Sequence, residues 1–103
     1  MEYRLDNYSR NPQMLLDRMA GNCKARRLEM GYSRRTLSEL TGIPAPTLEH
    51  FERTGQISFE SFCKLVIQFD YFEEMSAILD HTKYSNSQEL EVINKNRDRR
   101  KGR

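Results

Sequence analysis

Gly42 stands between two short segments with helical character, and it constrains the fold of this chain more than any other residue. Ser33 is a favourable N-cap, because its hydroxyl can accept a hydrogen bond from the free N–H groups of a first helical turn. The sequence predicts a helix from Arg34 to about Thr41, which Gly42 ends, since glycine adopts the left-handed conformation after a helix at little steric cost. A second helix is expected to follow directly, because Pro44 and Pro46 suit a helix start, where a missing N–H costs nothing.

Apolar residues on one side of each segment indicate how the two helices would pack. Leu37 and Leu40 form the apolar side of the first helix, and Leu48 and Phe51 that of the second. Ile43 is an apolar residue within the turn and is predicted to plug the space between them. Two helices that meet at a steep angle across a short turn containing glycine form a helix-turn-helix.

Several residues of this segment follow one another in a register that is typical of one family of regulators. They are Ser33, Leu37, Ser38, Gly42, Ile43, Leu48 and Glu52, with alanine being more usual at the position of Ser38. This order resembles the helix-turn-helix of phage repressors, Cro proteins and XRE regulators, and the resemblance covers roughly Leu16 to Leu79. It implies an all-α fold, a five-helix lambda-repressor-like helix-turn-helix domain.

The resemblance also implies a structural clamp between Arg27 and Glu52. In the resembled family, an arginine at the offset of Arg27 pairs with the glutamate at the end of the second helix of the motif, which is Glu52 here. A planar guanidinium can hold a carboxylate through two hydrogen bonds and so join two helices. The alternative is that Arg27 is a solvated residue on the face of its helix.

The second helix of such a motif enters the major groove of DNA, where its N-terminal residues meet base edges. Ala45, Pro46, Glu49 and His50 would face the bases, and Thr47 and Arg34 the phosphates. The candidate DNA-binding residues are therefore Arg34, Ala45, Pro46, Thr47, Glu49, His50 and Arg53.

The recognition positions depart from the family, which usually carries Gln, Arg, Asn or Ser there. Ala45 and Pro46 allow only apolar contacts, for example with a thymine methyl group, while Glu49 can accept from cytosine N4. His50 can donate or accept a hydrogen bond. The alternative is that Glu49 and His50 are solvated residues on a motif that has lost DNA binding.

Helices are also expected on both sides of the motif. Asn11-Pro12 is a helix-start signal, and a helix should run to Met30, where Gly31 closes it; Gly21-Asn22 marks where it could break. Its core-facing residues are predicted to be Leu16, Ala20, Cys23 and Leu28.

After the motif, Ser58 is predicted to cap an amphipathic helix. A fifth helix is expected from about Phe72 to Leu79, and the resemblance places the dimer contact at this end of the domain. The candidates for that contact are Phe72, Met75 and Leu79, and the predicted core stripe of the preceding helix is Phe59, Phe62, Leu65, Val66 and Phe69.

The ends of the chain differ in character from its middle. We expect an N-terminal arm at 1–11, the DNA-binding domain at 12–80 and a basic tail at 81–103, in which Ser87 could cap a short helix containing Leu90 and Ile93. The last ten residues carry a net charge of +5, whereas the net charge of the whole chain is +2. The rest of the chain therefore carries a net charge of −3. A uniformly basic surface is thus excluded, and the tail beyond Ile93 is predicted to be disordered.

Other classes of function find little support in the sequence. No catalytic set of residues and no phosphate-binding glycine loop is apparent, so an enzyme is not expected. Cys23 and Cys63 are expected to be free thiols, and with His50 and His81 they show no metal-ligand spacing, so no metal or cofactor is expected. Without an apolar run of about 20 residues or a signal peptide, a cytoplasmic protein without a membrane anchor is expected.

A narrower resemblance concerns the role of the protein. The segment FERTGQISFESFCKLVIQFDY and the tail SNSQELEVINKNRDRR are similar to HipB-like antitoxins, which repress their own operon and bind a HipA-type kinase toxin. The sequence therefore predicts a DNA-binding repressor that binds a palindromic operator as a homodimer and serves as such an antitoxin. The alternative is a protein-interaction module, binding a toxin or another regulator, whose helix-turn-helix is only a scaffold.

Overall fold

The computed structural model of the chain describes residues 10–81, 91–92 and 94–97. Its labelled helices are α2 (Pro12–Glu29), α3 (Arg34–Thr41), α4 (Ala45–Thr54), α5 (Phe59–Gln68) and α6 (Phe72–Ser76). Residues 91–92 and 94–97 are helical as well, and the described residues contain no strand, which confirms the predicted all-α fold. Within this part of the chain, no helix combines the length and the apolar character needed to cross a membrane.

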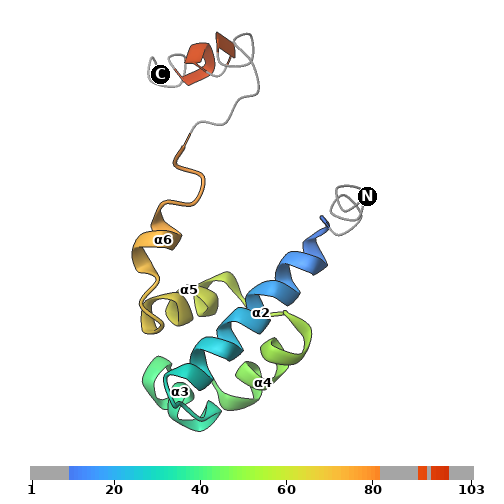
Figure 1. Cartoon of the computed structure of the whole chain (residues 1–103), viewed down its shortest axis with the longest axis vertical. Helices are drawn as coiled ribbons and strands as arrows, with labels where there is room; N and C mark the ends of the chain where they lie inside the picture. The colour runs from blue at the N-terminus through green and yellow to red at the C-terminus, as the bar shows by residue number, and fades with distance from the viewer. Residues whose placement is uncertain (1–9, 82–90, 93, 98–103) are drawn as a thin grey trace. The chain divides into compact units, whose positions relative to one another are not determined.

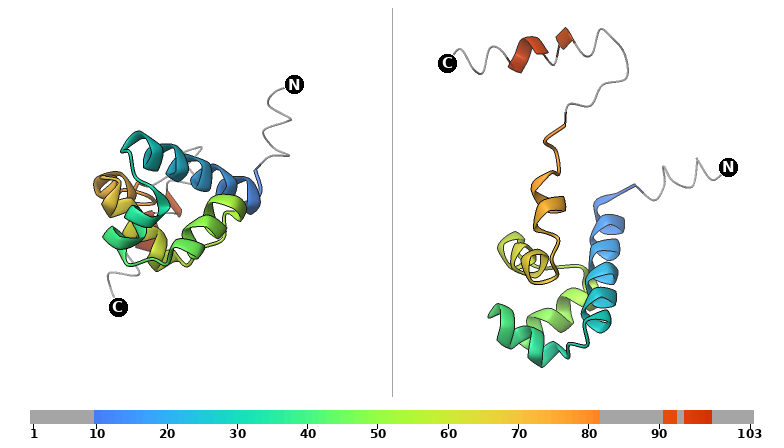
Figure 2. Two further views of the ribbon diagram at one scale, coloured as in Figure 1. Left: turned by 90° about the horizontal axis from the view of Figure 1, so that it is seen from below. Right: turned by 60° about the vertical axis from the view of Figure 1, so that its left-hand side comes forward.

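The chain divides into two compact units, Met1–Phe72 and Glu73–Arg103. In the first unit α4 packs against both α2 and α3, and α3 also packs against α5 (Figures 1 and 2). Arg26 ties α2 to the end of α5, because its Nε atom donates to the carbonyl of Phe69 at 3.2 Å and its guanidinium lies 5.6 Å from the centre of the Tyr71 ring.

Local hydrogen bonds explain where the helices begin. The side chains of Asn11, Ser33 and Ser58 accept from the backbone N–H three residues further on, at 2.8, 3.0 and 3.1 Å, and so start α2, α3 and α5. Gly42 and Gly55 end α3 and α4 in the left-handed conformation, with φ of 80° and 82°. A residue with a Cβ would be strained at both positions.

The core of the first unit lies between the four helices. Its fully buried members come from α3, the following turn, α4 and α5, and the edge of the Phe62 ring meets Phe51 at a centroid distance of 6.3 Å. The residues of the buried core cluster are Ala20, Leu37, Ile43, Leu48, Phe51, Leu65 and Phe69.

Three leucine and phenylalanine residues predicted to face the core are exposed instead. The exposed fractions of Leu28, Leu40 and Phe59 are 59%, 50% and 69%. Arg27, the residue next to Leu28 in α2, is buried in place of Leu28. The helical period gives the direction of a side chain, but it does not tell how far the neighbouring elements extend to cover it.

Some predicted boundaries also need correction. α2 passes through Gly21 without a break and ends at Glu29, with Met30 as its cap and Gly31 in the left-handed conformation. α6 ends at Ser76, and Leu79 lies outside it at a φ of 70°.

The predicted helix at Ser87, Leu90 and Ile93 lies on residues outside the described part of the chain. Beyond Ile93, where disorder was predicted, residues 94–97 are helical, and 98–103 lie outside the described residues.

We expect Gly55→Ala to destabilise the protein more than Gly42→Ala. Both glycines have the same left-handed backbone, where an added Cβ costs about 1–2 kcal/mol. At Gly55 the new Cβ would also lie 2.8 Å from the Cβ of Leu16 in α2, whereas at Gly42 it meets nothing within 4 Å. The resulting overpacking should add about 1–3 kcal/mol. Chemical denaturation of both variants measures the difference, and equal losses would show that α2 and α4 do not approach closely at Gly55.

Candidate functional site

The carboxylate of Glu52 is the electrostatic centre of the first unit. Arg27 donates to it twice, from Nε to Oε2 at 2.7 Å and from Nη2 to Oε1 at 3.1 Å. Both side chains are almost completely buried, with 7% and 5% of their surface exposed. The remaining Nη1 atom of Arg27 donates to the carbonyl of Tyr32 at 2.9 Å, so one guanidinium holds α2, α4 and the loop between α2 and α3.

Arg34 joins the same carboxylate from α3. Its Nε atom donates to Oε1 of Glu52 at 2.9 Å, and its side chain remains 39% exposed. Arg34 was predicted to contact only DNA phosphates, so its contact with Glu52 was not predicted. The two Nη atoms make no ion pair within the described residues, so they can still reach an anion at the surface.

The pKa of Glu52 is lower than its ordinary value. Burial by itself would raise this pKa, but the hydrogen bonds and the positive charges of Arg27 and Arg34 outweigh it. The neighbouring thiol of Cys23 has its pKa raised to about 11, because it is buried and because Glu52 carries a negative charge. Cys23 is thus a protonated thiol at neutral pH, and the ion cluster is ionised.

The outer face of α4 carries most of the other predicted site residues. Pro46, His50 and Arg53 are exposed. Arg53 donates from Nε to Glu49 at 3.2 Å, and its Nη2 atom lies 3.4 Å from Nδ1 of His50. An arginine can only donate, so in a hydrogen bond between these two atoms Nδ1 of His50 is the acceptor. Ala45, Thr47 and Glu49 are half-buried on the flanks of the same face.

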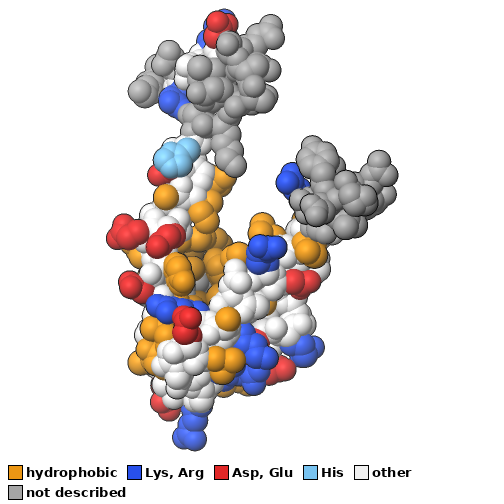
Figure 3. All heavy atoms as spheres, viewed as in Figure 1, with side chains coloured by type: hydrophobic (Ala, Val, Ile, Leu, Met, Phe, Trp, Pro, Cys, Tyr) orange, Lys and Arg blue, Asp and Glu red, His pale blue; other side chains and the backbone are white. Residues whose placement is uncertain are grey.

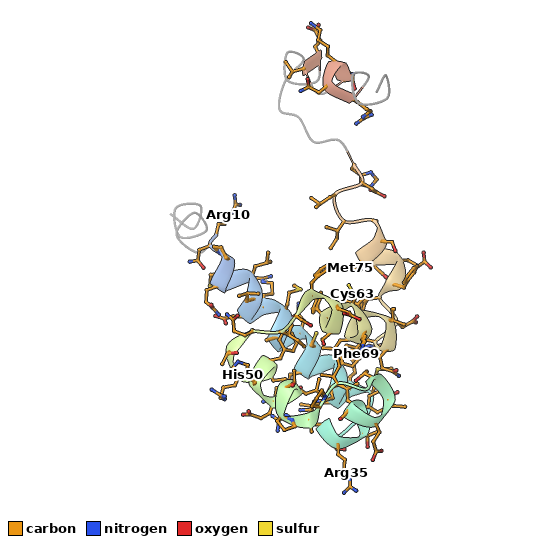
Figure 4. The ribbon with its side chains drawn as sticks, turned by 180° about the vertical axis from the view of Figure 1, so that it is seen from behind. Arg10, Arg35, His50, Cys63, Phe69 and Met75 are labelled. Atoms are coloured by element: carbon orange, nitrogen blue, oxygen red, sulfur yellow. The ribbon has the colours of Figure 1, made fainter. Side chains whose placement is uncertain are left out.

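Arg35 is a further exposed cation that the candidate set from the sequence omits. Its side chain is 89% exposed and lies only 3.7 Å from Glu39 through Nε, a loose contact one turn along α3. Figure 4 shows Arg35 pointing away from the ribbon, while His50 projects from α4. The signal for Arg35 is its place next to Arg34 at the start of the predicted helix, since adjacent side chains of an α-helix point about 100° apart and so reach different parts of the surface.

The three residues predicted for the dimer contact are divided between the two compact units. Phe72 is exposed and ends the first unit. Met75 is half-buried and Leu79 is 95% exposed, and both belong to the second unit.

Comparison of the chain with protein-family models, curated proteins and solved structures finds no match. Among the described residues, no three His, Cys, Asp or Glu side chains are grouped as they would be around a metal ion. Two features of the described residues offer chemistry for a function: the buried cluster of Arg27, Arg34 and Glu52, and the exposed side of α4.

Glu52→Gln should destabilise the fold strongly, because it leaves the buried charge of Arg27 without its partner. Breaking a buried ion pair costs about 3–5 kcal/mol. Glu49→Gln is the matched control, since Glu49 lies on the same helix in an exposed pair whose loss costs about 0.3–0.5 kcal/mol. Urea unfolding of both variants measures the difference, and similar losses would mean that the Glu52 cluster is solvated.

The stability that Glu52 provides should also depend on pH. Because its pKa is lower in the folded chain than in the unfolded one, the ionised cluster stabilises the fold above about the ordinary value of 4.5. This contribution is lost as the pH falls through the lower pKa of the folded state. The difference in unfolding free energy between the unchanged protein and Glu52→Gln should therefore shrink as the pH falls from 7 to about 3. A constant difference would contradict the assignment.

Proposed function

We propose that this protein is a sequence-specific DNA-binding transcriptional regulator, a repressor in which α3 and α4 form a helix-turn-helix. The observation that carries the proposal is the division of α4 into two faces. One face is held in the fold by Leu48, Phe51 and Glu52, while Pro46 and His50 on the other are exposed. A helix supported in this way can enter a major groove with its outer face free.

The rigid support of α4 matters for reading a sequence. Side chains can discriminate between bases only if their distances to the base edges are reproducible. Glu52 joins α4 to Arg27 on α2 and to Arg34 on α3, and these contacts restrict rotation and sliding of α4 against its neighbours. Glu52 would thus support recognition by holding α4 in place, without itself contacting DNA.

The outer face of α4 offers a small set of base contacts. His50 can donate to or accept from a base edge, and Glu49 can accept from cytosine N4. Ala45 and Pro46 suit a thymine methyl group. In the free protein Glu49 is paired with Arg53, so each can exchange this partner for a group on the DNA.

Phosphate contacts are best supplied by α3 and its first residues. Arg35 is almost fully exposed, and the side chain of Arg34 is 39% exposed. Thr47 can add a hydroxyl donor from the start of α4. Contacts of this kind position a protein on the duplex, while base contacts provide specificity.

The proposal includes a homodimer on a palindromic operator, since repressors of this type meet half-sites about 34–36 Å apart. It also places the protein in the cytoplasm, and the basic C-terminal residues would add affinity for any DNA. The resemblance to HipB-like proteins extends the proposal to an antitoxin that represses its own operon and binds a HipA-type kinase.

A second candidate function is a protein-interaction module whose helix-turn-helix is only a scaffold. The observation that favours it is the weak charge of the α4 face, where Glu49 neutralises Arg53. Large apolar side chains are also exposed elsewhere, among them Ile67 and Phe72. Exposed apolar residues in groups are typical of surfaces that bind protein partners.

Two variants should separate base reading from phosphate binding. Arg35→Ala should weaken binding to all DNA and reduce the slope of log K against log salt by about 0.9, because one phosphate contact is lost. His50→Ala should keep the slope and reduce the preference for the operator over random DNA by about 1–3 kcal/mol if His50 makes a base contact. The measurement is affinity against salt on the protein's own upstream region and on scrambled DNA.

Arg18→Ala is the control for charge. Arg18 is exposed on the side of α2 opposite to the buried Ala20 and Arg27, so its loss should not change the slope. No preference of the unchanged protein for its own upstream DNA would overturn the proposal and favour the interaction module.

A further inference from the structure

One side of α5 exposes a row of apolar residues to solvent. Phe59 and Ile67 are 69% and 60% exposed, and Cys63, half-buried, lies between them. The three residues are spaced by four along the helix, so they lie on one side of it. The opposite side of α5 is fixed in the core through Leu65 and Phe69. Figure 3 shows hydrophobic side chains at the surface over this helix.

Two charged residues border this row. Glu60 and Lys64 each follow a member of the row by one residue, so they lie along one edge of it. Both are exposed, and neither makes an ion pair within the described residues, although a Glu–Lys spacing of four allows one. A partner with the reverse order of charges along this edge would find both charges available.

We propose that the occupant of this face is a second copy of the chain, packed with its α5 antiparallel to the first. A two-fold axis perpendicular to the helices and passing near Cys63 places Phe59 of one copy opposite Ile67 of the other. The two Cys63 side chains then meet at the axis. A contact of this kind is isologous, since the same row faces itself, and it closes as a dimer.

The border charges favour this arrangement. Rotation about such an axis keeps the charged edge on the same side and reverses the order of its residues. Measured along the helix axis, Glu60 of one copy is then about 3 Å from Lys64 of the other, given a rise of about 1.5 Å per residue. The reciprocal pair forms at the same time, so one chain supplies both signs. Charge complementarity of this kind sets the register of an interface.

The inference rests on the proposed function and deepens it, because it names the surface through which two DNA-binding units would associate. It differs from the contact expected at Phe72, Met75 and Leu79. In Figure 4, Cys63 and His50 lie apart, so a contact through α5 leaves the outer face of α4 open. α5 is only about 15 Å long. The area that one such helix side can bury is therefore smaller than the roughly 800 Å² per partner of a typical stable interface. A weak dimer is expected, one that paired half-sites would reinforce.

Cys63 provides a direct probe of the axis. A short bismaleimide should cross-link the full-length protein to a dimer, in a yield that rises with protein concentration. Cys63→Ser should abolish the cross-link and Cys23→Ser should not, since the pKa of Cys23 is raised and its thiol reacts slowly. A cross-link that survives Cys63→Ser, or none at any concentration with the unchanged protein, would overturn the inference.

Charge reversal tests the antiparallel register. Glu60→Lys alone and Lys64→Glu alone should each weaken the dimer roughly tenfold in sedimentation equilibrium, because like charges then face each other. A mixture of the two variants should restore association, since every facing pair again has opposite signs. A mixture that associates no better than its components would rule out the α5 pairing.

A hydrophobic change with a matched control completes the test. Ile67→Glu should shift the protein to monomer, while Leu28→Glu, at an equally exposed leucine of α2, should not. Circular dichroism establishes that both variants fold. If Leu79→Glu dissociates the dimer and Ile67→Glu does not, the contact lies at the other predicted site and the inference fails.

DNA binding separates this inference from the proposed function. A monomeric Ile67→Glu variant should bind a single half-site as well as the unchanged protein and lose only the advantage of a palindrome. If the unchanged protein dimerises through Cys63 but binds no DNA, the proposed function fails and the α5 contact stands. Equal binding of the palindrome by both proteins would count against the α5 contact alone.

Discussion

The hydrogen-bonded pair of Arg27 and Glu52 is the interaction on which the arrangement of the first unit depends. Taking a carboxylate and a guanidinium out of water is costly, and their attraction offsets this cost only when the geometry is close and the remaining donors are satisfied. Here the three donor nitrogens of Arg27 have partners, and Glu52 accepts from Arg34 as well. Compared with apolar packing, such a cluster adds specificity of position more than stability, because any displacement of one helix leaves a buried charge unpaired.

This cluster and the apolar core act on the same helix from the same side. Leu48 and Phe51 bury the inner face of α4, and Gly55 allows its C-terminal end to approach the backbone of Leu16 at a distance that no larger residue permits. The outer face of α4 carries no part of the core, so its residues are free of packing constraints. A helix that is held on one side and chemically open on the other is suited to recognition of an extended partner, which is what the proposed binding to DNA requires.

The exposed apolar residues have a common cause in the size of the unit. A core of about seven buried residues from four short helices cannot cover every apolar side chain that helical periodicity provides. Scattered exposed residues such as Leu28 and Leu40 need no further explanation, since much of any protein surface is apolar. The row on α5 differs because its members are adjacent, follow one helix side and are bordered by charges of both signs.

The sequence by itself determined the helices and most of their ends. Ser33, Ser58 and Gly42 act through hydrogen bonds and backbone angles within a few residues, so their effect can be read without knowledge of the fold. The burial of Leu37, Leu48 and Phe51 was predictable for a similar reason, since helical spacing places them on one side. Only the tertiary structure decided that Arg34 shares Glu52 with Arg27, that Phe59 stays exposed and that Gly55 meets Leu16. These outcomes depend on how residues that are distant in sequence lie relative to one another in space, and a local sequence pattern contains no information on that arrangement.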